Sequence, residues 1–185
     1  MCGRYATTRG ATDLSALFES YDDTGGRLVA DYNVAPTDPV PVVRLSERLG
    51  GRVLSMARWG LVPSWARDDR GAARMINARA ETVTEKAAFR NAFAKRRCLI
   101  VVDGFYEWRP GPQGKRPHRI CLHDRRAFTL AGLWDRWDRA SEPVESCTIL
   151  TTSANTAMAP IHDRMPVIVR DGERDAWLSG STDVE

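Results

Sequence analysis

The chain is dominated by short apolar segments of strand length, separated by glycine, proline and polar residues. Five such segments lie at 40–45, 52–59, 97–102, 145–152 and 166–169. They are rich in β-branched and other apolar residues and are bounded by turn residues, a pattern typical of β-strands. Gly50 and Gly51 are expected to turn the first strand into the second. Residues 116–124 and 126–134 are expected to form a second hairpin.

Helical patterns are fewer and shorter. Residues 12–20 and 171–178 each indicate a short helix, and residues 84–96 give the clearest helical pattern, with apolar side chains on one face. Residues 30–39 and 60–74 are expected to be loops because of their prolines and glycines. Many strands with a few short helices predict an α+β domain built around a curved sheet or open barrel.

The length of 185 residues fits one domain with a real core, so we expect a single domain over 1–185. No run of about 18 apolar residues is present, which argues against a membrane span. The N-terminus lacks the charged and then apolar pattern of a secretory signal. The sequence therefore predicts a cytoplasmic protein.

The net charge of +3 and the pI of about 8.8 are mildly basic, which does not by itself identify a nucleic-acid partner. Only three of the 27 basic residues are lysines. Arginine suits bidentate binding of phosphate, but a GC-rich genome would produce the same bias.

The cysteines do not form a metal-binding pattern. Cys98, Cys121 and Cys147 lie in apolar segments and are expected to be small buried residues in a reducing compartment. His118, Cys121 and His123 come nearest to a metal cluster, but no second ligand pair follows them. We therefore predict neither a metal nor a cofactor.

Four polar segments are difficult to explain by packing alone. They are MCGRYA (1–6), MINARAET (75–82), VVDGFYEWRP (101–110) and APIHDRMPVIV (159–169). Their candidate reactive residues are Cys2, Asn77, Glu107 and His162. In an extended second segment, Asn77, Arg79 and Glu81 would share one side, because side chains alternate along a strand.

Glu107 is the most suggestive of these residues because it lies among aromatic side chains in GFYEW. Loss of hydration raises the pKa of a carboxyl group toward the range that acid–base catalysis needs. The structural alternative is a glutamate at a turn, paired with Arg109 or facing water. His162 could instead be a structural residue before a strand, and Asn77 could simply hold a turn.

Cys2 directly follows the initiator methionine. If Met1 is removed, Cys2 carries a free α-amine beside its thiol. An α-amine has a reference pKa of about 7.7–8.0 against about 10.4 for lysine, so its neutral fraction near neutral pH is roughly 300-fold larger. Arg4 would lower the thiol pKa. The structural alternative is a small buried residue of a first strand.

Taken together, the motifs are far more specific than any one residue. The sequence resembles the SRAP (SOS response-associated peptidase) family of abasic-site processing proteins. The resemblance rests on MCGRYA, YNVAPT (32–37), RWGLVPSWA (58–66), NARAET (77–82), RRCLIVVDGFYEW (96–108) and IHDRMPVI (161–168), and it extends in order from residue 1 to about residue 178. It implies a strand-rich SRAP domain.

The resemblance implies a protein that binds single-stranded DNA containing an abasic site. The open form of that sugar has an aldehyde at C1′. The α-amine of Cys2 would form a Schiff base with this carbon, and the thiol would then add to it, giving a thiazolidine that joins protein to DNA. Asn77 would orient the amine, and Glu107 would move protons. His162 would open the closed sugar ring.

DNA contacts are also implied by the resemblance. Arg4 and Arg79 would bind flanking phosphates, which position DNA without reading its sequence. Further DNA-binding candidates are Trp59, Pro63, Trp65 and Thr151, since exposed aromatic side chains stack on unpaired bases. For the tryptophans, packing in the core is the alternative.

Some expectations concern the whole protein. The family leads us to expect more chain beyond the helix at 171–178, whereas this sequence ends at STDVE. We expect a monomer that is associated with the nucleoid when it is on DNA. Self-processing peptidase activity and lyase activity at the abasic site are both compatible with the family.

Two other functions fit part of the pattern. An N-terminal-nucleophile cysteine amidohydrolase or peptidase would use the thiol of Cys2 and its own amine as base. It would retain some activity after Cys2→Ser, whereas a thiazolidine could not form. A single-strand DNA-binding module would bind reversibly and would tolerate Cys2→Ala.

Overall fold

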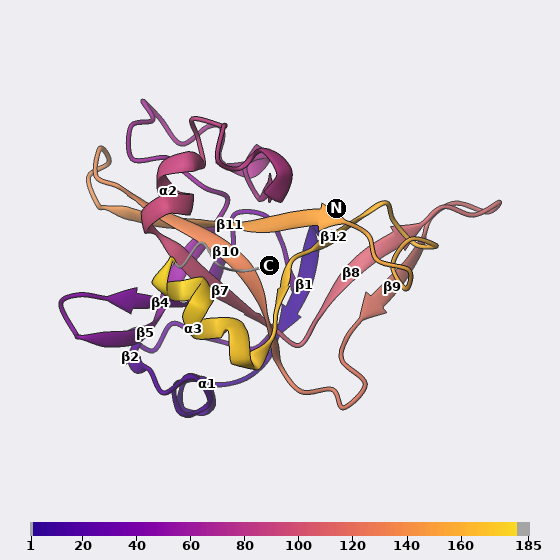
Figure 1. Cartoon of the computed structure of the whole chain (residues 1–185), viewed down its shortest axis with the longest axis horizontal. Coiled ribbons are helices and arrows are strands. Elements are labelled where there is room, and N and C mark those ends of the chain that lie inside the picture. The colour runs from indigo at the N-terminus through magenta and orange to yellow at the C-terminus, as the bar shows by residue number, and fades with distance from the viewer. Residues whose placement is uncertain (1, 181–185) are drawn as a thin grey trace.

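The computed structural model describes residues 2–180, which form two β-sheets with short helices on the outside (Figure 1). The larger sheet has the order β12 (Arg164–Pro166), β11 (Val144–Ser153), β10 (Phe128–Trp137), β7 (Arg97–Val102), β4 (Pro39–Ser46), β5 (Gly51–Trp59), β2 (Tyr21–Asp23), with β13 (Ile168–Val169) on β10 and β6 (Asn77–Arg79) on β11. The smaller sheet has the order β3 (Asp31–Val34), β1 (Arg4–Thr7), β8 (Gly104–Arg109), β9 (Arg116–Ile120).

The helices are α1 (Ala11–Phe18), α2 (Arg90–Lys95) and α3 (Arg174–Ser179), with 3₁₀ turns at Ala72–Arg74, Ala80–Thr82 and Asp171–Glu173. In residues 2–180 no helix is long and apolar enough to cross a membrane. This mostly-β architecture with few short helices confirms the predicted fold class.

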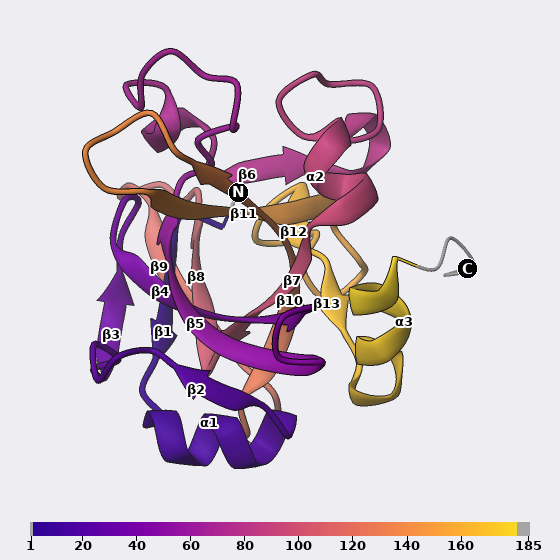
Figure 2. The same cartoon turned by 90° about the vertical axis from the view of Figure 1, so that its left-hand side faces the viewer.

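Part of the larger sheet closes into a ring. A short parallel pairing of Ser146 with Arg58 and of Cys147 with Trp59 joins β11 to β5, so that β5, β4, β7, β10 and β11 surround a common interior. Because this closing pairing is so short, the ring is not a regular barrel. Figure 2 shows the helices on the outside of the ring.

The two faces of the ring strands bury different sets of side chains, because neighbouring residues on a strand point to opposite faces. Val42 and Ile100 lie in the interior cluster, whereas their neighbours Val43 and Leu99 lie in the outer cluster, under α1 and α3. At Gly132 of β10 an added Cβ would lie 2.8 Å from Cys98 Sγ, so the interior has no room there for a side chain. The smaller sheet adds Tyr5, Phe105 and other residues to the interior cluster.

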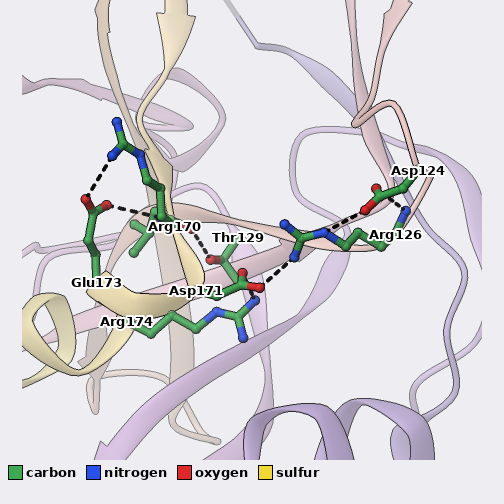
Figure 3. Close-up of polar contacts among 8 residues, drawn as sticks. Asp124, Arg126, Thr129, Arg170, Asp171, Glu173 and Arg174 are labelled. Carbon is green, nitrogen blue, oxygen red and sulfur yellow. Dashed lines mark hydrogen bonds and ion pairs between the residues drawn. The ribbon is translucent and has the colours of Figure 1, made fainter.

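Ion pairs fix the C-terminal helix region against the sheet (Figure 3). Asp171 accepts hydrogen bonds from Arg126 Nη1 at 2.6 Å and from Arg174 Nη2 at 2.7 Å. Arg126 Nε also donates to Asp124, and the backbone amide of Arg170 donates to Glu173. The Arg174 guanidinium is nearly buried and lies 4.6 Å from the centre of the Phe18 ring of α1.

Some predicted elements differ from the structure. The predicted helix at 84–96 is helical only over α2, and residues 82–89 form successive turns in which the Thr82 carbonyl accepts from the amides of Glu85 and Lys86. The apolar pattern is nevertheless used, since Phe89 and Phe93 pack on the outer cluster. Successive turns are enough to bury these side chains. Tertiary packing therefore overrides the helix propensity of this segment.

The predicted hairpin of 116–124 with 126–134 is wrong. β9 pairs with β8 in the smaller sheet, whereas β10 pairs with β7 and β11 in the larger one. The glycine- and proline-rich loop at 110–115 makes the β8–β9 hairpin the local one. Residues 30–39, predicted as loop, contribute β3 and the start of β4.

Candidate functional site

Cys2 lies two residues before the start of β1, with its side chain completely buried in the interior cluster. β1 runs between β3 and β8, and its Arg4 is paired with Tyr106 of β8. This pairing brings the N-terminal segment next to the carboxylate of Glu107. Burial, followed by the negative charge of Glu107, raises the pKa of the Cys2 thiol well above its ordinary value.

Asn77 joins the N-terminal segment to the ring. It is the first residue of β6, which pairs in parallel with β11 at Ile149. Its side-chain Nδ2 donates a hydrogen bond of 2.9 Å to the Cys2 carbonyl oxygen. The Cys2 backbone is therefore held from the side of β6, while Glu107 acts on its thiol from the side of β8.

Glu107 is almost fully buried, with 2% of its surface exposed. It lies on β8 opposite His118 of β9, and the next residue on the same side toward the interior, Phe105, is completely buried. The carboxylate is close enough to Cys2 to raise the pKa of its thiol by its charge. A buried carboxylate beside a thiol can accept the proton that the thiol loses.

His162 lies in the turn that precedes β12, and its backbone amide donates to the Met158 carbonyl at 3.0 Å. Its neighbour Ile161 packs against the interior cluster that contains Cys2. The ring nitrogen Nδ1 lies 2.9 Å from the Arg164 amide nitrogen and 2.8 Å from Asp163 Oδ1. A neutral ring accepts the amide hydrogen at Nδ1 and carries its own proton on Nε2, whereas a protonated ring donates from Nδ1 to Asp163.

A clasp formed by Glu81 and Arg164 supports this turn. The two terminal guanidinium nitrogens of Arg164, Nη1 and Nη2, donate to the two carboxylate oxygens of Glu81 at 2.7 and 2.9 Å. Nη2 also donates to the Thr151 carbonyl at 2.7 Å. The hydrogen bonds from Arg164 lower the pKa of Glu81 to about 2. The backbone amide of this same Arg164 contacts His162, so the clasp fixes the position of the imidazole. The sequence analysis did not predict this pairing, although Glu81 lies in NARAET and Arg164 lies two residues after His162.

The predicted DNA-binding residues fall into two groups. Arg79 is exposed, Trp65 is 56% exposed, and Arg4 is partly exposed with its Nη1 donating to Asn33 Oδ1 at 2.9 Å. Arg4 therefore faces Asn33. The prediction that Arg4 lowers the pKa of the Cys2 thiol is wrong for this structure, because burial and Glu107 raise it.

Trp59, Pro63 and Thr151 are buried, and the prediction that they form a strand-binding surface is corrected on that ground. Trp59 points into the ring, where its ring centre is 5.0 Å from that of Tyr5 and its Nε1 donates to the Ile76 carbonyl. A fully buried indole offers no face to a base. Core packing, the alternative weighed for the tryptophans, is what the structure has at this position.

The remaining cysteines are structural. Cys98 and Cys147 are completely buried and unpaired, as predicted, whereas Cys121 follows the end of β9 and is partly exposed. Among residues 2–180, no three His, Cys, Asp or Glu side chains lie close enough to hold a metal ion.

Known proteins share both the sequence and the fold. The chain is 39% identical to the abasic site processing protein YoqW of Bacillus subtilis, over 97% of this chain and 80% of that protein. It is 31% identical to the abasic site processing protein HMCES of Gallus gallus, over 96% of this chain and 65% of that protein.

A crystal structure of a protein from Bacteroides thetaiotaomicron superposes with a TM-score of 0.88 at 29% identity, covering 98% of this chain and 83% of that one. The sequence profile described as SOS response associated peptidase (SRAP) matches residues 1–185. The chain therefore belongs to the SRAP family.

Proposed function

We propose that this protein processes abasic sites in single-stranded DNA by forming a covalent thiazolidine link through Cys2, after removal of Met1. The observation that carries the proposal is the placement of Cys2, whose backbone is held by Asn77 and whose thiol lies beside the buried carboxylate of Glu107. The names of relatives such as YoqW and HMCES support it.

The amine of Cys2 reacts first. With Met1 removed, Cys2 carries an α-amine, a group whose reference pKa of about 7.7–8.0 allows a neutral fraction of roughly a tenth at about pH 7. The amine nitrogen attacks C1′ of the open sugar, and the aldehyde oxygen leaves as water, so that a C=N bond joins the protein to the DNA. Asn77 holds the Cys2 carbonyl and thereby limits rotation of the amine.

The thiol then closes the ring. Its raised pKa keeps the sulfur protonated until the imine carbon lies beside it. As the S–C bond forms, the thiol proton moves to Glu107, and the imine nitrogen gains a proton to become the ring amine. The product has the mass of protein plus DNA minus one water. Only a cysteine with a free α-amine can form this five-membered ring.

His162 has a role before either step, because most of the abasic sugar is a closed hemiacetal. A protonated imidazole donates to the ring oxygen and releases the aldehyde. Asp163 and the clasp of Glu81 with Arg164 hold the imidazole in place. Outside this site, Arg4 and Arg79 contact flanking phosphates and Trp65 stacks on an unpaired base.

The deciding experiment mixes Met1-processed protein with single-stranded DNA that carries one abasic site, followed by a denaturing gel and intact-mass spectrometry. A species of protein plus DNA minus one water supports the proposal if it is absent with Cys2→Ala and with intact DNA. No covalent species, with removal of Met1 verified by mass, overturns it. Amide hydrolysis that survives in Cys2→Ser would identify the rival hydrolase instead.

Methionine removal is a separate part of the proposal. Either the protein removes its own first residue, as the family's peptidase description suggests, or a methionine aminopeptidase does so, since cysteine is small. Incubation of purified, unprocessed protein alone distinguishes the two. Loss of the mass of one methionine over time indicates self-processing.

A further inference from the structure

The hairpin formed by β8 and β9 carries several basic residues and, beyond Glu107, no carboxylate. Between Glu107 and Asp124 the sequence contains no acidic residue, whereas it contains Arg109, Lys115, Arg116, His118, Arg119 and His123. In Figure 1 this hairpin projects from the body of the molecule. Beyond the buried Glu107 the hairpin extends toward solvent, so its charges lead outward from the proposed reaction centre.

Two arginines face each other across the hairpin. Arg109 of β8 is paired with Arg116 of β9, and Glu107 is paired with His118. Residues two apart on a strand share a face, so both pairs lie on the same face of the hairpin. Directly opposite side chains have Cβ atoms about 5 Å apart, and like charges at that separation destabilise the pairing.

The structure does not neutralise this repulsion. Among residues 2–180, the side chains of Arg109, Lys115, Arg116 and His118 make no hydrogen bond or ion pair with another residue. Together with the loop at 110–114, these four residues line an open pocket of about 570 Å³. No acidic residue lines this pocket, so an anion that entered it would meet no negatively charged side chain.

The pocket lies close to the proposed reaction centre. Strand residues rise about 3.4 Å each, so Arg109 lies roughly 7 Å beyond Glu107 along β8. A DNA strand whose abasic sugar reaches Cys2 and Glu107 would carry its neighbouring phosphates past this face. Arginine guanidinium groups bind phosphate oxygens in a planar, bidentate manner.

We propose that Arg109 and Arg116 together bind one phosphate of the DNA strand that carries the abasic site, with Lys115 adding to the local positive potential. The identity of the strand rests on the proposed function. The chemistry of the pocket specifies a phosphodiester anion. The bound phosphate lies between the two guanidinium groups and removes their mutual repulsion.

The first test measures reversible binding of a fluorescein-labelled oligodeoxythymidine that has no abasic site. It compares Met1-processed wild type with the double variant Arg109→Gln/Arg116→Gln. The matched control is Arg48→Gln/Arg139→Gln, which removes the same charge from two exposed arginines in the β4–β5 and β10–β11 loops. In Figure 1 these loops lie on the opposite side of the molecule from the β8–β9 hairpin.

The hairpin variant should bind about tenfold more weakly at low salt, as expected for loss of hydrogen bonds to a charged group. Its plot of log affinity against log salt should be shallower by about 0.7, the contribution of one phosphate contact on a single strand. The control should keep the wild-type slope. Equal changes in both double variants would overturn the proposal, because they would reflect net charge alone.

A second test identifies the phosphate. Single methylphosphonate replacements, which are neutral, are placed in turn at each phosphate near the abasic position. One replacement should weaken binding by wild type and have no further effect on the hairpin variant, since the two changes remove the same contact. If every replacement weakens wild type and the variant by the same factor, Arg109 and Arg116 contact no phosphate.

The proposed function and this proposal can fail separately. At saturating abasic DNA, the hairpin variant should still form the covalent product, because Cys2 and Glu107 are unchanged. If no protein forms a covalent product, the proposed function fails, and the binding experiments still test the phosphate contact. If the covalent product forms and binding is unchanged, only the phosphate contact is refuted.

Discussion

The arginines around α3 and those of the β8–β9 hairpin are used in opposite ways. Arg126 and Arg174 share Asp171, and Arg170 contacts Glu173 (Figure 3). Within the described residues, Arg109 and Arg116 face each other without a carboxylate. Arginines neutralised within the chain hold elements together, whereas arginines left unneutralised beside the proposed reaction centre remain available for a ligand. Each group should therefore respond to a different measurement.

The largest effect should come from Glu107→Gln, on the same strand face as Arg109 but at the proposed reaction centre. Loss of a positioned acid–base group should slow formation of the covalent product by about 100-fold or more. Affinity for intact single-stranded DNA should not change. Single-turnover kinetics at saturating abasic DNA measure the rate, and a titration with intact DNA provides the control. An unchanged rate constant would remove Glu107 from the mechanism.

Asp171→Ala tests the neutralised group. The substitution removes the carboxylate that pairs with the nearly buried guanidinium of Arg174, which packs over the Phe18 ring. The free energy of unfolding should fall by about 2 kcal/mol, as for loss of a hydrogen bond to a charged group. Urea unfolding monitored by tryptophan fluorescence measures the change. The salt dependence of DNA binding should stay as in wild type, and a shallower slope would contradict the division between the two groups.

Glu81→Gln tests an arginine that is neutralised yet serves the site. Arg164 should lose part of its clasp, and displacement of His162 should slow crosslinking by about tenfold. DNA that carries an abasic-site analogue without the 4′-hydroxyl group, which therefore cannot close the sugar ring, should restore the rate, since ring opening is then bypassed. A rate that stays low with this substrate would assign Glu81 a role other than positioning His162.

The same variant has a defined pH signature. The folded-state pKa of Glu81 is about 2, below its ordinary value of 4.5, so ionised Glu81 stabilises the fold above about pH 4.5. This contribution is lost as the pH falls from there toward 2. Glu81 is half-exposed, so solvent screening keeps the contribution small. The free energies of unfolding of wild type and Glu81→Gln, measured as a function of pH, should converge at the acidic end. Parallel curves would contradict the lowered pKa of Glu81.

The smallest effect should be that of Arg109→Gln/Arg116→Gln on stability. Removing two like charges from opposite strand positions should change the free energy of unfolding by less than about 0.5 kcal/mol, with stabilisation as the expected sign. Urea unfolding beside Asp171→Ala measures it under the same conditions. A loss comparable to that of Asp171→Ala would show that the hairpin arginines are structural.

The sequence predicted the strands better than it predicted how they pair. Segments such as 97–102 and 145–152 were found because apolar β-branched runs identify strands directly. β9 pairs with β8 across the short loop at 110–115, a local turn that the sequence analysis did not identify. The closing contact of β11 with β5 joins residues far apart in the sequence. Local patterns do not encode such contacts, and they also mistook the turns before α2 for a helix.

For the site, the motifs identified residues but not their exposure. Cys2, Asn77 and Glu107 are brought together, as their joint occurrence in the motifs suggested. Trp59 was taken as a DNA-binding candidate, whereas in the structure it is fully buried on the same face of β5 as the buried Ala57. The acid-free stretch between Glu107 and Asp124 was visible in the sequence, but only the strand register shows that Arg109 faces Arg116.

The burial of Cys2 has a consequence for the chemical lifetime of the protein. Peroxides oxidise thiolates far faster than thiols, and they must reach the sulfur from solvent. A completely buried sulfur with a raised pKa is protected on both counts. In the proposed function, this protection would preserve the thiol through oxidative stress until an abasic-site aldehyde reaches it.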